Sequence, residues 1–545
     1  MKDEQRLLIA LGLSVLFLFA WQAMFPPPSP APGNGQSPAS AEPATATTRS
    51  IAESEPVAQV AAPSTTPPAV APVTTALPAS GTLPVLTIAG DRFEAEFHGD
   101  TVAHWRLLGY RVDLEPGAPL VDLCEREPDP CLRIGFAGLG PPATAEAIDG
   151  QPALRLVWPV GSGELFARVH AQSLSRAKVT FGSRGVPDGT RFEPVVEMAH
   201  HYAPDFSRYV FTGLRLRRGG EIESIRGNDL EAEHRWEGSF DWVMWDDKYF
   251  ARAILPDDAS AELQIRVRNL PDSGDDKRGR AWLTISAAPQ VLRAGHEGLF
   301  EFTVFGGAKE LDQLRRIGRE MRSSVDFGWT AFIARPMLAL MHLFHRVTGN
   351  YGWAIILLTI LIKMALYPLT AKSYRSMRAM SKLKPKMEEI QKKYKEDPQR
   401  LQQEMMNLYR TEKVNPLGGC LPMLLQIPIF FALYNVLLVS IELRHAPFLL
   451  WVHDLAAPDT LATLALFGHA IPVRILPLIM GVTMFLQQKM TPTTVDPAQQ
   501  KIFMLMPVMF TVLFYGFPSG LVLYWLTNNV MTIAQQWLIA RQAAD

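Results

Sequence analysis

The chain has 545 residues, 53 Lys+Arg against 54 Asp+Glu, and three cysteines. This length suggests several structural units rather than one core, and the balanced charge argues against both a globally basic nucleic-acid binder and an acidic disordered chain. Three cysteines are too few for a disulfide scaffold. The informative feature is the uneven distribution of apolar residues along the chain.

The N-terminus contains an apolar stretch, Leu7–Phe25, that is long enough to cross a hydrocarbon core of about 30 Å as a helix. A cleaved signal peptide has a similar composition, but no convincing Ala-x-Ala site follows it. Trp21 and Phe25 are typical of residues that anchor a helix at the membrane interface. We therefore predict that residues 1–25 form an uncleaved transmembrane signal anchor.

Residues 26–85 are rich in Pro, Ala and Thr, and 14 of the 43 prolines lie at positions 26–84. Such a composition cannot bury enough apolar surface to offset the entropy of ordering the chain. We predict a disordered tether.

Between residues 86 and 325, apolar and polar residues alternate with a period of two. The clearest runs are Arg92–Phe97, Leu263–Arg268 and Leu299–Phe305, separated by segments with Gly, Pro and Asp. This alternation places the apolar side chains on one face of each strand. We predict a large antiparallel β-sandwich domain over residues 86–325.

Cys124 and Cys131 bracket a short charged loop in this region. The two thiols could pair in an oxidising compartment, but the distance between them cannot be read from the sequence, so both states stay open. The histidines and cysteines lack metal-site spacing, and no Gly-Lys dipeptide, and hence no Walker A loop, occurs. We expect no metal, no cofactor and no enzymatic activity.

An amphipathic segment, residues 326–349, comes next. Its apolar residues recur every three or four positions: Trp329, Phe332, Ile333, Met337, Leu340, Met341 and Phe344. The stripe is typical of a helix in the membrane interface. A helix packed on the sandwich would show the same spacing, and we favour the interface because a predicted membrane span follows.

Residues 350–545 contain five further apolar segments of about the length that a spanning helix needs. They are Tyr351–Leu369, Leu417–Ser440, Ile471–Gln488, Ile502–Phe517 and Leu521–Ile539. Leu461–Phe467 is too short to span, and we interpret it as a re-entrant or interfacial piece. The sequence predicts a polytopic α-helical membrane protein with six transmembrane helices and a large antiparallel β-sandwich domain.

Basic residues indicate the orientation, because Lys and Arg accumulate in cytoplasmic loops. Residues 371–416 hold 12 Lys+Arg and 6 Asp+Glu, whereas residues 441–470 hold only Arg444 as a basic residue. We expect both termini in the cytoplasm and the β-sandwich outside, which in a Gram-negative-type cell means an inner-membrane protein with a periplasmic domain.

The basic segment 371–416 also carries apolar residues at helical spacing. They predict two antiparallel helices that turn near residues 396–398, with Pro385 either kinking or restarting the first helix. Met377, Met380, Met387 and Met405 are the expected contact residues of this hairpin. They serve either packing of the hairpin on itself or binding of apolar partners.

Lys363 stands inside the first of the five apolar segments. An ammonium group in mid-membrane costs roughly 2.5–3.5 kcal/mol, so either the side chain reaches the cytoplasmic interface or a hydrated cavity surrounds it. No Asp or Glu occurs within the five segments, and polar side chains that would line a cavity recur there: Thr359, Gln426, Asn435, Gln487, Asn528 and Asn529. We favour the cavity.

Five motifs then indicate a family resemblance that covers essentially the whole chain. They are Leu366–Thr370, Lys413–Cys420, Gln426–Phe430, Gln488–Thr494 and Phe517–Tyr524. In this order they resemble the YidC/Oxa1/Alb3 membrane-protein insertases. The N-terminal anchor, the tether and the β domain resemble the long Gram-negative type of that family.

The resemblance implies a five-helix insertase core with a groove open to the cytoplasm and the lipid. The family usually has an arginine at the position of Lys363, so this chain keeps the charge but loses bidentate recognition of carboxylates. By similarity, Thr359, Gln426, Tyr524 and Trp525 would line the groove or touch the substrate. The implied partners are nascent membrane proteins, the Sec translocon with its accessory subunits, the lipid bilayer, and the ribosome through cytoplasmic loops rather than through a basic tail.

Insertion and folding of new membrane proteins is the function that this resemblance implies. A secondary transporter of an anionic solute is the alternative, because a cation and polar helix faces also suit such a solute. A membrane-anchored periplasmic carbohydrate enzyme ranks last, because five spanning segments would then have no role. Sequence-specific nucleic-acid binding is not expected.

Overall fold

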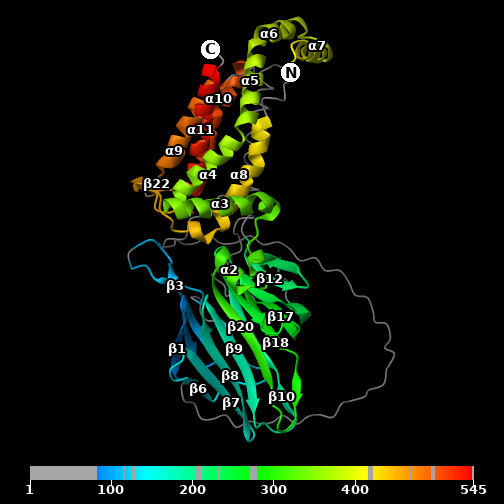
Figure 1. Cartoon of the computed structure of the whole chain (residues 1–545), viewed down its shortest axis with the longest axis vertical. Helices are drawn as coiled ribbons and strands as arrows, with labels where there is room; N and C mark the ends of the chain where they lie inside the picture. The colour runs from blue at the N-terminus through cyan, green and yellow to red at the C-terminus, as the bar shows by residue number, and fades with distance from the viewer. Residues whose placement is uncertain are drawn as a thin grey trace, which may run out of the picture. The chain divides into compact units, whose positions relative to one another are not determined.

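The computed structural model describes residues 83–542, with gaps at 116, 125–130, 203–210, 231–232, 271–278, 415–420, 467–468 and 492–496. The predicted anchor and the tether up to residue 82 lie outside the described residues, as does Cys420. Within the described part, most strands precede most helices along the chain (Figure 1).

Two nine-stranded antiparallel sheets form the β domain (Figure 1). The first has the order β1-β2-β3-β5-β11-β18-β17-β14, with β4 paired to β3, and its strands are β1 Val85–Ala89, β2 Phe93–His98, β3 Thr101–Arg111, β4 Leu120–Asp122, β5 Leu132–Phe136, β11 Pro194–Tyr202, β14 Glu233–Ser239, β17 Glu262–Leu270 and β18 Gly279–Ala287.

The second sheet has the order β13-β12-β15-β16-β20-β9-β8-β7-β6. Its strands are β6 Thr144–Ala147, β7 Ala153–Val160, β8 Gly163–Gln172, β9 Arg176–Arg184, β12 Gly213–Arg218, β13 Glu221–Arg226, β15 Trp242–Asp246, β16 Phe250–Pro256 and β20 Leu299–Ala308. A separate two-stranded sheet pairs β10 (Thr190–Phe192) with β19 (Gln290–Leu292).

Buried side chains follow the alternation that the sequence predicted. In β17, Leu263, Ile265 and Val267 are buried, and the residues between them are exposed. They join Phe97 of the first sheet and Phe181 of the second in one hydrophobic cluster, so the two sheets pack face to face. The predicted antiparallel β domain is confirmed.

The last part of the predicted β region is helical. β20 ends at Ala308, and α2 (Leu311–Ile317) and the 3-10 helix η2 (Met321–Ser324) follow it. Gly318 ends α2, because its φ of 86° is a left-handed conformation that stops the helical hydrogen-bond pattern. The prediction of strands is therefore wrong beyond Ala308.

The C-terminal part is mainly helical. Its elements are η3 Gly328–Thr330, α3 Ala331–Thr348, α4 Tyr351–Ala365, α5 Tyr367–Lys382, α6 Lys384–Lys393, α7 Pro398–Thr411, α8 Leu421–Val439, η5 Ile441–Leu443, α9 Ile475–Met490, α10 Pro497–Phe514 and α11 Ser519–Gln542 (Figure 1). Among the described residues, no single helix has both the length and the hydropathy of a membrane span; α4 and α5 meet both criteria only together, across a bend of 62°. The count of six spans stays a prediction.

The first predicted span of this part ends earlier than expected. α4 stops at Ala365 instead of continuing to Leu369, and α5 starts at Tyr367 in a new direction. Pro368 in the first turn of α5 explains the break, since it has no backbone N–H to continue the α4 pattern. Lys363 therefore lies in the last turn of α4, two residues before the helix ends.

α3 is apolar on two sides. Ala334, Met337 and Met341 are buried, and the helix contacts α4 and α8. Phe332 and Val347, in contrast, are 72% and 79% exposed. The predicted stripe thus divides into an edge that packs inside the protein and an edge that faces outward.

The stretch that the sequence indicated as a re-entrant or interfacial piece is a β-hairpin. β21 (Ala462–Leu466) pairs antiparallel with β22 (His469–Val473). The β-branched residues Thr463 and Ile471 favour extended backbone. The next helix consequently starts at Ile475 and not at Ile471.

Candidate functional site

A sharp corner between α3 and α4 fixes the direction of α4. Gly349 ends α3 with a φ of 67°. The side-chain oxygen of Asn350 then accepts hydrogen bonds from the backbone N–H groups of Gly352 (2.8 Å) and Trp353 (3.3 Å), which caps α4. The side-chain nitrogen of Asn350 donates to the carbonyl of Pro447 at 2.9 Å and ties the start of α4 to the loop after α8.

Lys363 is the cation at the centre of the candidate site. Its side chain is only 9% exposed, and its Nζ donates a hydrogen bond to the Oγ1 of Thr532 in α11 at 2.9 Å. Among the described residues, no carboxylate forms an ion pair with this amine. Its position in the last turn of α4 is favourable, because the C-terminal carbonyls of a helix carry partial negative charge.

A stripe of polar residues runs along α11 beside Lys363. Tyr524, Asn528, Thr532 and Gln535 follow one another at spacings of four, four and three residues, so they share one helix face over about 16 Å. The Nε2 of Gln535 donates to the backbone carbonyl of Lys363 at 3.0 Å. We call these four residues the polar stripe of α11.

The polar stripe also reaches α8. The side-chain amide of Gln426 donates a hydrogen bond to the hydroxyl of Tyr524 at the upstream end of the stripe. Tyr524 is buried, so this hydroxyl would otherwise lack a partner. Polar groups from α4, α8 and α11 therefore lie along one line, which includes Lys363, Gln426, Tyr524 and Asn528. That they line a substrate groove stays a prediction.

Two buried oxygens of the polar stripe find no hydrogen-bond partner among the described residues. They are the Oδ1 of Asn528 and the Oε1 of Gln535. Buried polar atoms are nearly always paired with protein or water, since an unpaired one costs about 1–3 kcal/mol. These two oxygens lie on the same helix face as Thr532, the hydrogen-bond partner of the Lys363 amine.

A second polar face of α11 has a different use. The side-chain nitrogen of Asn529 donates to the Oγ1 of Thr483 at 3.2 Å, and that of Gln536 donates to the Oγ1 of Thr491 at 3.1 Å. Asn529 and Gln536 are buried, and both hydrogen bonds join α11 to α9 or its C-terminal cap. This face holds helices together through both side-chain nitrogens, although the Oε1 of Gln536 is also buried without a hydrogen-bond partner among the described residues. It serves as a control for the polar stripe.

Three predicted groove residues have other contacts. Asn435 donates to the carbonyl of Phe327 at 3.1 Å, ahead of α3. Thr359 is buried and donates to the carbonyl of Ile355 in its own helix at 2.7 Å. Trp525 packs in an aromatic cluster with α8 and α10. No hydrogen bond of the described residues links these three to Lys363.

Thr532 and Gln535 are functional candidates that the sequence reading missed. Both lie in the last predicted span, and a signal for them existed, because they follow Asn528 at helical spacings of four and seven residues. Polar residues at such spacing share a helix face, but the sequence does not say which face meets Lys363.

The predicted methionine contacts lie mostly inside the hairpin formed by α5, α6 and α7. Met380 and Met387 are buried beside Leu383, and Met405 packs against them. Met377 is half-buried outside this cluster. The placement favours packing of the hairpin on itself over a surface for apolar partners.

A half-buried carboxylate, Glu442, lies in the 3-10 helix η5. The Oε1 of Glu442 is 3.7 Å from the Nε2 of His342, and Glu310, Asp312 and Tyr351 are its other titratable neighbours. Burial, reinforced by the two acidic neighbours, raises the pKa of Glu442 from 4.5 to about 7. Because the folded-state pKa is the higher one, the stability that this group contributes is complete below about pH 4.5 and is lost as the pH rises through 7.

We expect Glu442→Gln to remove that pH dependence. The raised pKa corresponds to a loss of roughly 3 kcal/mol in the free energy of unfolding between pH below 4.5 and pH above 7. Thermal unfolding of the full chain from pH 5 to 8 should show a falling midpoint for the wild type and a nearly constant one for Glu442→Gln. Glu320→Gln, at an exposed carboxylate, should follow the wild type. Parallel curves for the wild type and Glu442→Gln would contradict the assignment.

Two family models match the chain. Residues 343–545 match the family described as 60Kd inner membrane protein, and residues 189–340 match the YidC periplasmic domain. A crystal structure described as an active YidC insertase with the first transmembrane domain resolved is 19% identical, with a TM-score of 0.36, and the likeness covers 84% of this chain and 94% of that chain.

Two relatives carry the name membrane protein insertase YidC. The one from Geobacter metallireducens is 35% identical over 561 residues, covering 99% of this chain and 99% of the relative. The one from Syntrophobacter fumaroxidans is 46% identical over 342 residues, covering 62% of this chain and 60% of the relative. These relatives give the transporter alternative no support. With its helical core and its β domain both matched, the chain belongs to the YidC family of membrane protein insertases.

Proposed function

We propose that Lys363 and the polar stripe of α11 receive the hydrophilic end of a newly made membrane protein. The observation that carries the proposal is the buried Lys363 amine, with Thr532 as a neutral partner, beside the unsatisfied oxygens of Asn528 and Gln535. A carboxylate of the entering chain would pair with the amine, and its backbone N–H groups would satisfy the oxygens. A lysine holds such a carboxylate as a point charge without fixed bidentate geometry, which suits a transient contact.

The energy for insertion comes from the substrate. An apolar helix that moves from water into lipid gains about 25 cal/mol for each Å² of apolar surface removed from water. A membrane potential that is positive outside adds about 2.3 kcal/mol per 100 mV for each negative charge that moves outward. The task of the polar site is therefore to lower the barrier for the hydrophilic tail.

We assign the basic hairpin of α5–α7 and both termini to the cytoplasm. Residues 371–416 hold 12 Lys+Arg and 6 Asp+Glu, a bias that supports this orientation. The same positive charge suits contact with a translating ribosome through the hairpin. The Sec translocon is the partner that we expect for substrates with large translocated domains.

We further assign the exposed edge of α3 and the hairpin β21–β22 to the water–lipid interface on the periplasmic side of the inner membrane. Residues 461–473 contain no Asp, Glu, Lys or Arg, and Leu464 is 50% exposed. A two-stranded hairpin with exposed apolar residues is only marginally stable in water. It cannot lie in the hydrocarbon core either, because the backbone N–H and C=O groups at its strand edges would have no hydrogen-bond partners there. The interface satisfies both conditions.

A fluorophore attached at position 464 should report this contact. In a Cys420→Ala background, Leu464→Cys labelled with an environment-sensitive dye is expected to show blue-shifted emission that shallow brominated lipids quench in nanodiscs. Leu299→Cys, at an apolar residue of the β domain that is 66% exposed, is the control and should not be quenched. Equal quenching at both positions, or none at 464, would contradict the assignment.

Proteoliposomes test the proposed function directly. The purified full chain should insert a short membrane protein with an acidic translocated tail, and crosslinkers at Gln426 and Asn528 should capture that tail during insertion. Failure to insert such a substrate, together with uptake of a small anion, would contradict the proposal.

A further inference from the structure

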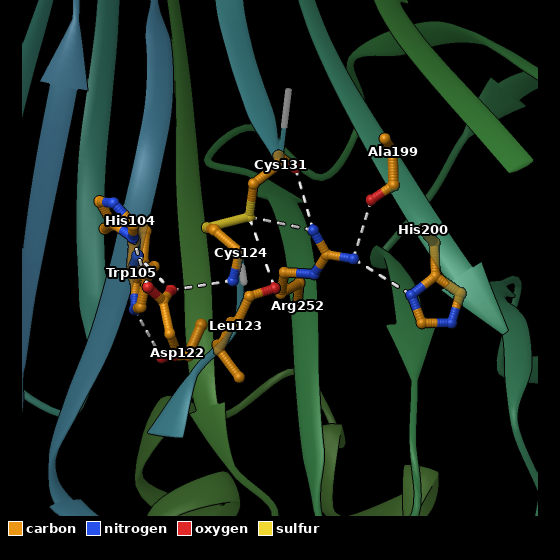
Figure 2. Close-up of a disulfide and its surroundings, with 10 residues drawn as sticks. His104, Trp105, Asp122, Leu123, Cys124, Cys131, Ala199, His200 and Arg252 are labelled. Carbon is orange, nitrogen blue, oxygen red and sulfur yellow. Dashed lines mark hydrogen bonds and ion pairs between the residues drawn. A yellow bond between two sulfur atoms is a disulfide. The ribbon is translucent and has the colours of Figure 1, made fainter. Parts of the chain in front are cut away.

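The structure bonds the two cysteines whose pairing the sequence left open. Cys124 follows β4, Cys131 precedes β5, and their Sγ atoms form a disulfide with a Cα–Cα distance of 5.0 Å (Figure 2). Both residues are buried, at 8% and 6% exposure. The backbone N–H of Cys124 donates to the Oδ1 of Asp122 at 2.9 Å, which holds the first cysteine in place.

An arginine of the opposite sheet contacts the disulfide. Arg252 in β16 donates from Nη1 to the Sγ of Cys131 at 3.1 Å and to its backbone carbonyl at 3.0 Å (Figure 2). Its Nη2 donates to the carbonyl of Ala199 at 2.8 Å and lies 3.1 Å from the Nδ1 of His200. Figure 2 shows the guanidinium between the disulfide and the His200 ring.

None of these Arg252 partners is a carboxylate. Two are carbonyls, one is a ring nitrogen, and one is a disulfide sulfur. The nearest acidic influence is Asp247, whose Oδ1 lies 3.8 Å from the Nε2 of His200 on the far side of that ring. Although burial lowers the pKa of Arg252 to about 10, the guanidinium stays charged at neutral pH. A half-buried cation with no carboxylate in direct contact is costly.

Reduction of the disulfide would supply a counter-ion. A thiolate at Cys131 would lie within hydrogen-bond distance of the Nη1 of Arg252, and a nearby arginine favours the thiolate over the thiol. Stabilising the reduced form makes a disulfide easier to reduce, and the sulfur that is the better thiolate is the better leaving group. Arg252 thus makes the two sulfurs chemically unequal.

We propose that Cys124–Cys131 is a reversible thiol–disulfide exchange site for dithiol reductants, with Cys124 as the attacked sulfur and Cys131 as the leaving group held by Arg252. The thiolate of the dithiol bonds to the Sγ of Cys124, the disulfide bond breaks, and its electron pair stays on the Sγ of Cys131. The second thiol of the dithiol loses its proton and attacks the mixed disulfide, and Cys124 leaves and takes up a proton. The protein gains two electrons, and the dithiol becomes a disulfide.

The equilibrium constant for reduction tests this proposal, and the assay does not need insertion activity. The full chain with Cys420→Ala is equilibrated with mixtures of reduced and oxidised dithiothreitol, quenched in acid, and labelled with a maleimide of high mass. We expect Arg252→Met to shift the equilibrium toward the disulfide by at least tenfold, or about 30 mV. Arg252→Lys, which keeps the charge, should stay within threefold of the parent. A smaller shift in Arg252→Met, or the same shift in Arg252→Lys, would overturn the role of the charge.

A second measurement covers the case in which Arg252→Met does not fold. With Cys124→Ser and Cys420→Ala, Cys131 is a single thiol whose alkylation rate can be followed against pH. Its apparent pKa should lie at least one unit below the ordinary value of about 8.5. The matched variant Cys131→Ser, which leaves Cys124 as the single thiol, should show no such depression. An ordinary or raised pKa at Cys131 would overturn the proposal.

Discussion

Replacing Lys363 by alanine is expected to reduce insertion of substrates with acidic translocated tails by at least tenfold. Two opposite charges 4 Å apart attract by about 4 kcal/mol at an effective dielectric of 20, and a third of that attraction accounts for a tenfold change in rate. Rates are measured in proteoliposomes with matched substrates whose tails differ only in Asp and Glu against Asn and Gln. Substrates with uncharged tails should insert within about twofold of the wild type.

Two further variants separate charge from structure. Lys363→Arg keeps the charge and should retain insertion of acidic tails. Lys363→Met fills a similar volume without charge, so it should lose insertion as Lys363→Ala does while its thermal stability is unchanged or higher, because an unpaired buried charge is removed. Equal insertion of acidic tails by Lys363→Met and the wild type would eliminate the charge-capture step.

The elements of this fold were predictable wherever one local pattern decides the structure. Alternation in Leu263–Arg268 predicted which side chains of β17 are buried, because a strand with one buried face has a period of two. Long uninterrupted apolar segments predicted the positions of α8 and α11, because a segment of that length and composition has few stable conformations other than a helix. Lys363 stood out for the same reason, as a charge in an apolar run.

Contacts between distant segments were not predictable. Lys363 and Thr532 are 169 residues apart, and the sequence does not set the rotation of α11 that brings the hydroxyl to the amine. The break before Pro368 was missed because apolar composition continues across it, although a proline there disfavours helix in the residue before it. The β-hairpin before α9 was missed because short apolar runs suit strand and membrane segment alike.

The second large effect is expected at the polar stripe of α11. The double variant Asn528→Leu with Gln535→Leu should lower insertion of acidic-tailed substrates by about tenfold, because it makes the surface beside Lys363 apolar and removes the oxygens that a polar tail or water would meet. Its thermal midpoint should stay close to that of the wild type, since only the hydrogen bond from Gln535 to the Lys363 carbonyl is lost and two unsatisfied oxygens disappear with it.

The second polar face of the same helix provides the matched control. Asn529→Leu with Gln536→Leu makes the same chemical change one position further along the helix, where the side chains bond to Thr483 and Thr491. Hydrogen bonds between membrane helices average about 0.6 kcal/mol, so this variant should lose stability modestly and keep insertion. The contrast assigns function to the side of α11 that faces Lys363. If both double variants lost insertion equally, the polar stripe would have no role beyond that of any polar residue in α11, and substrate capture would have to be sought on other helices.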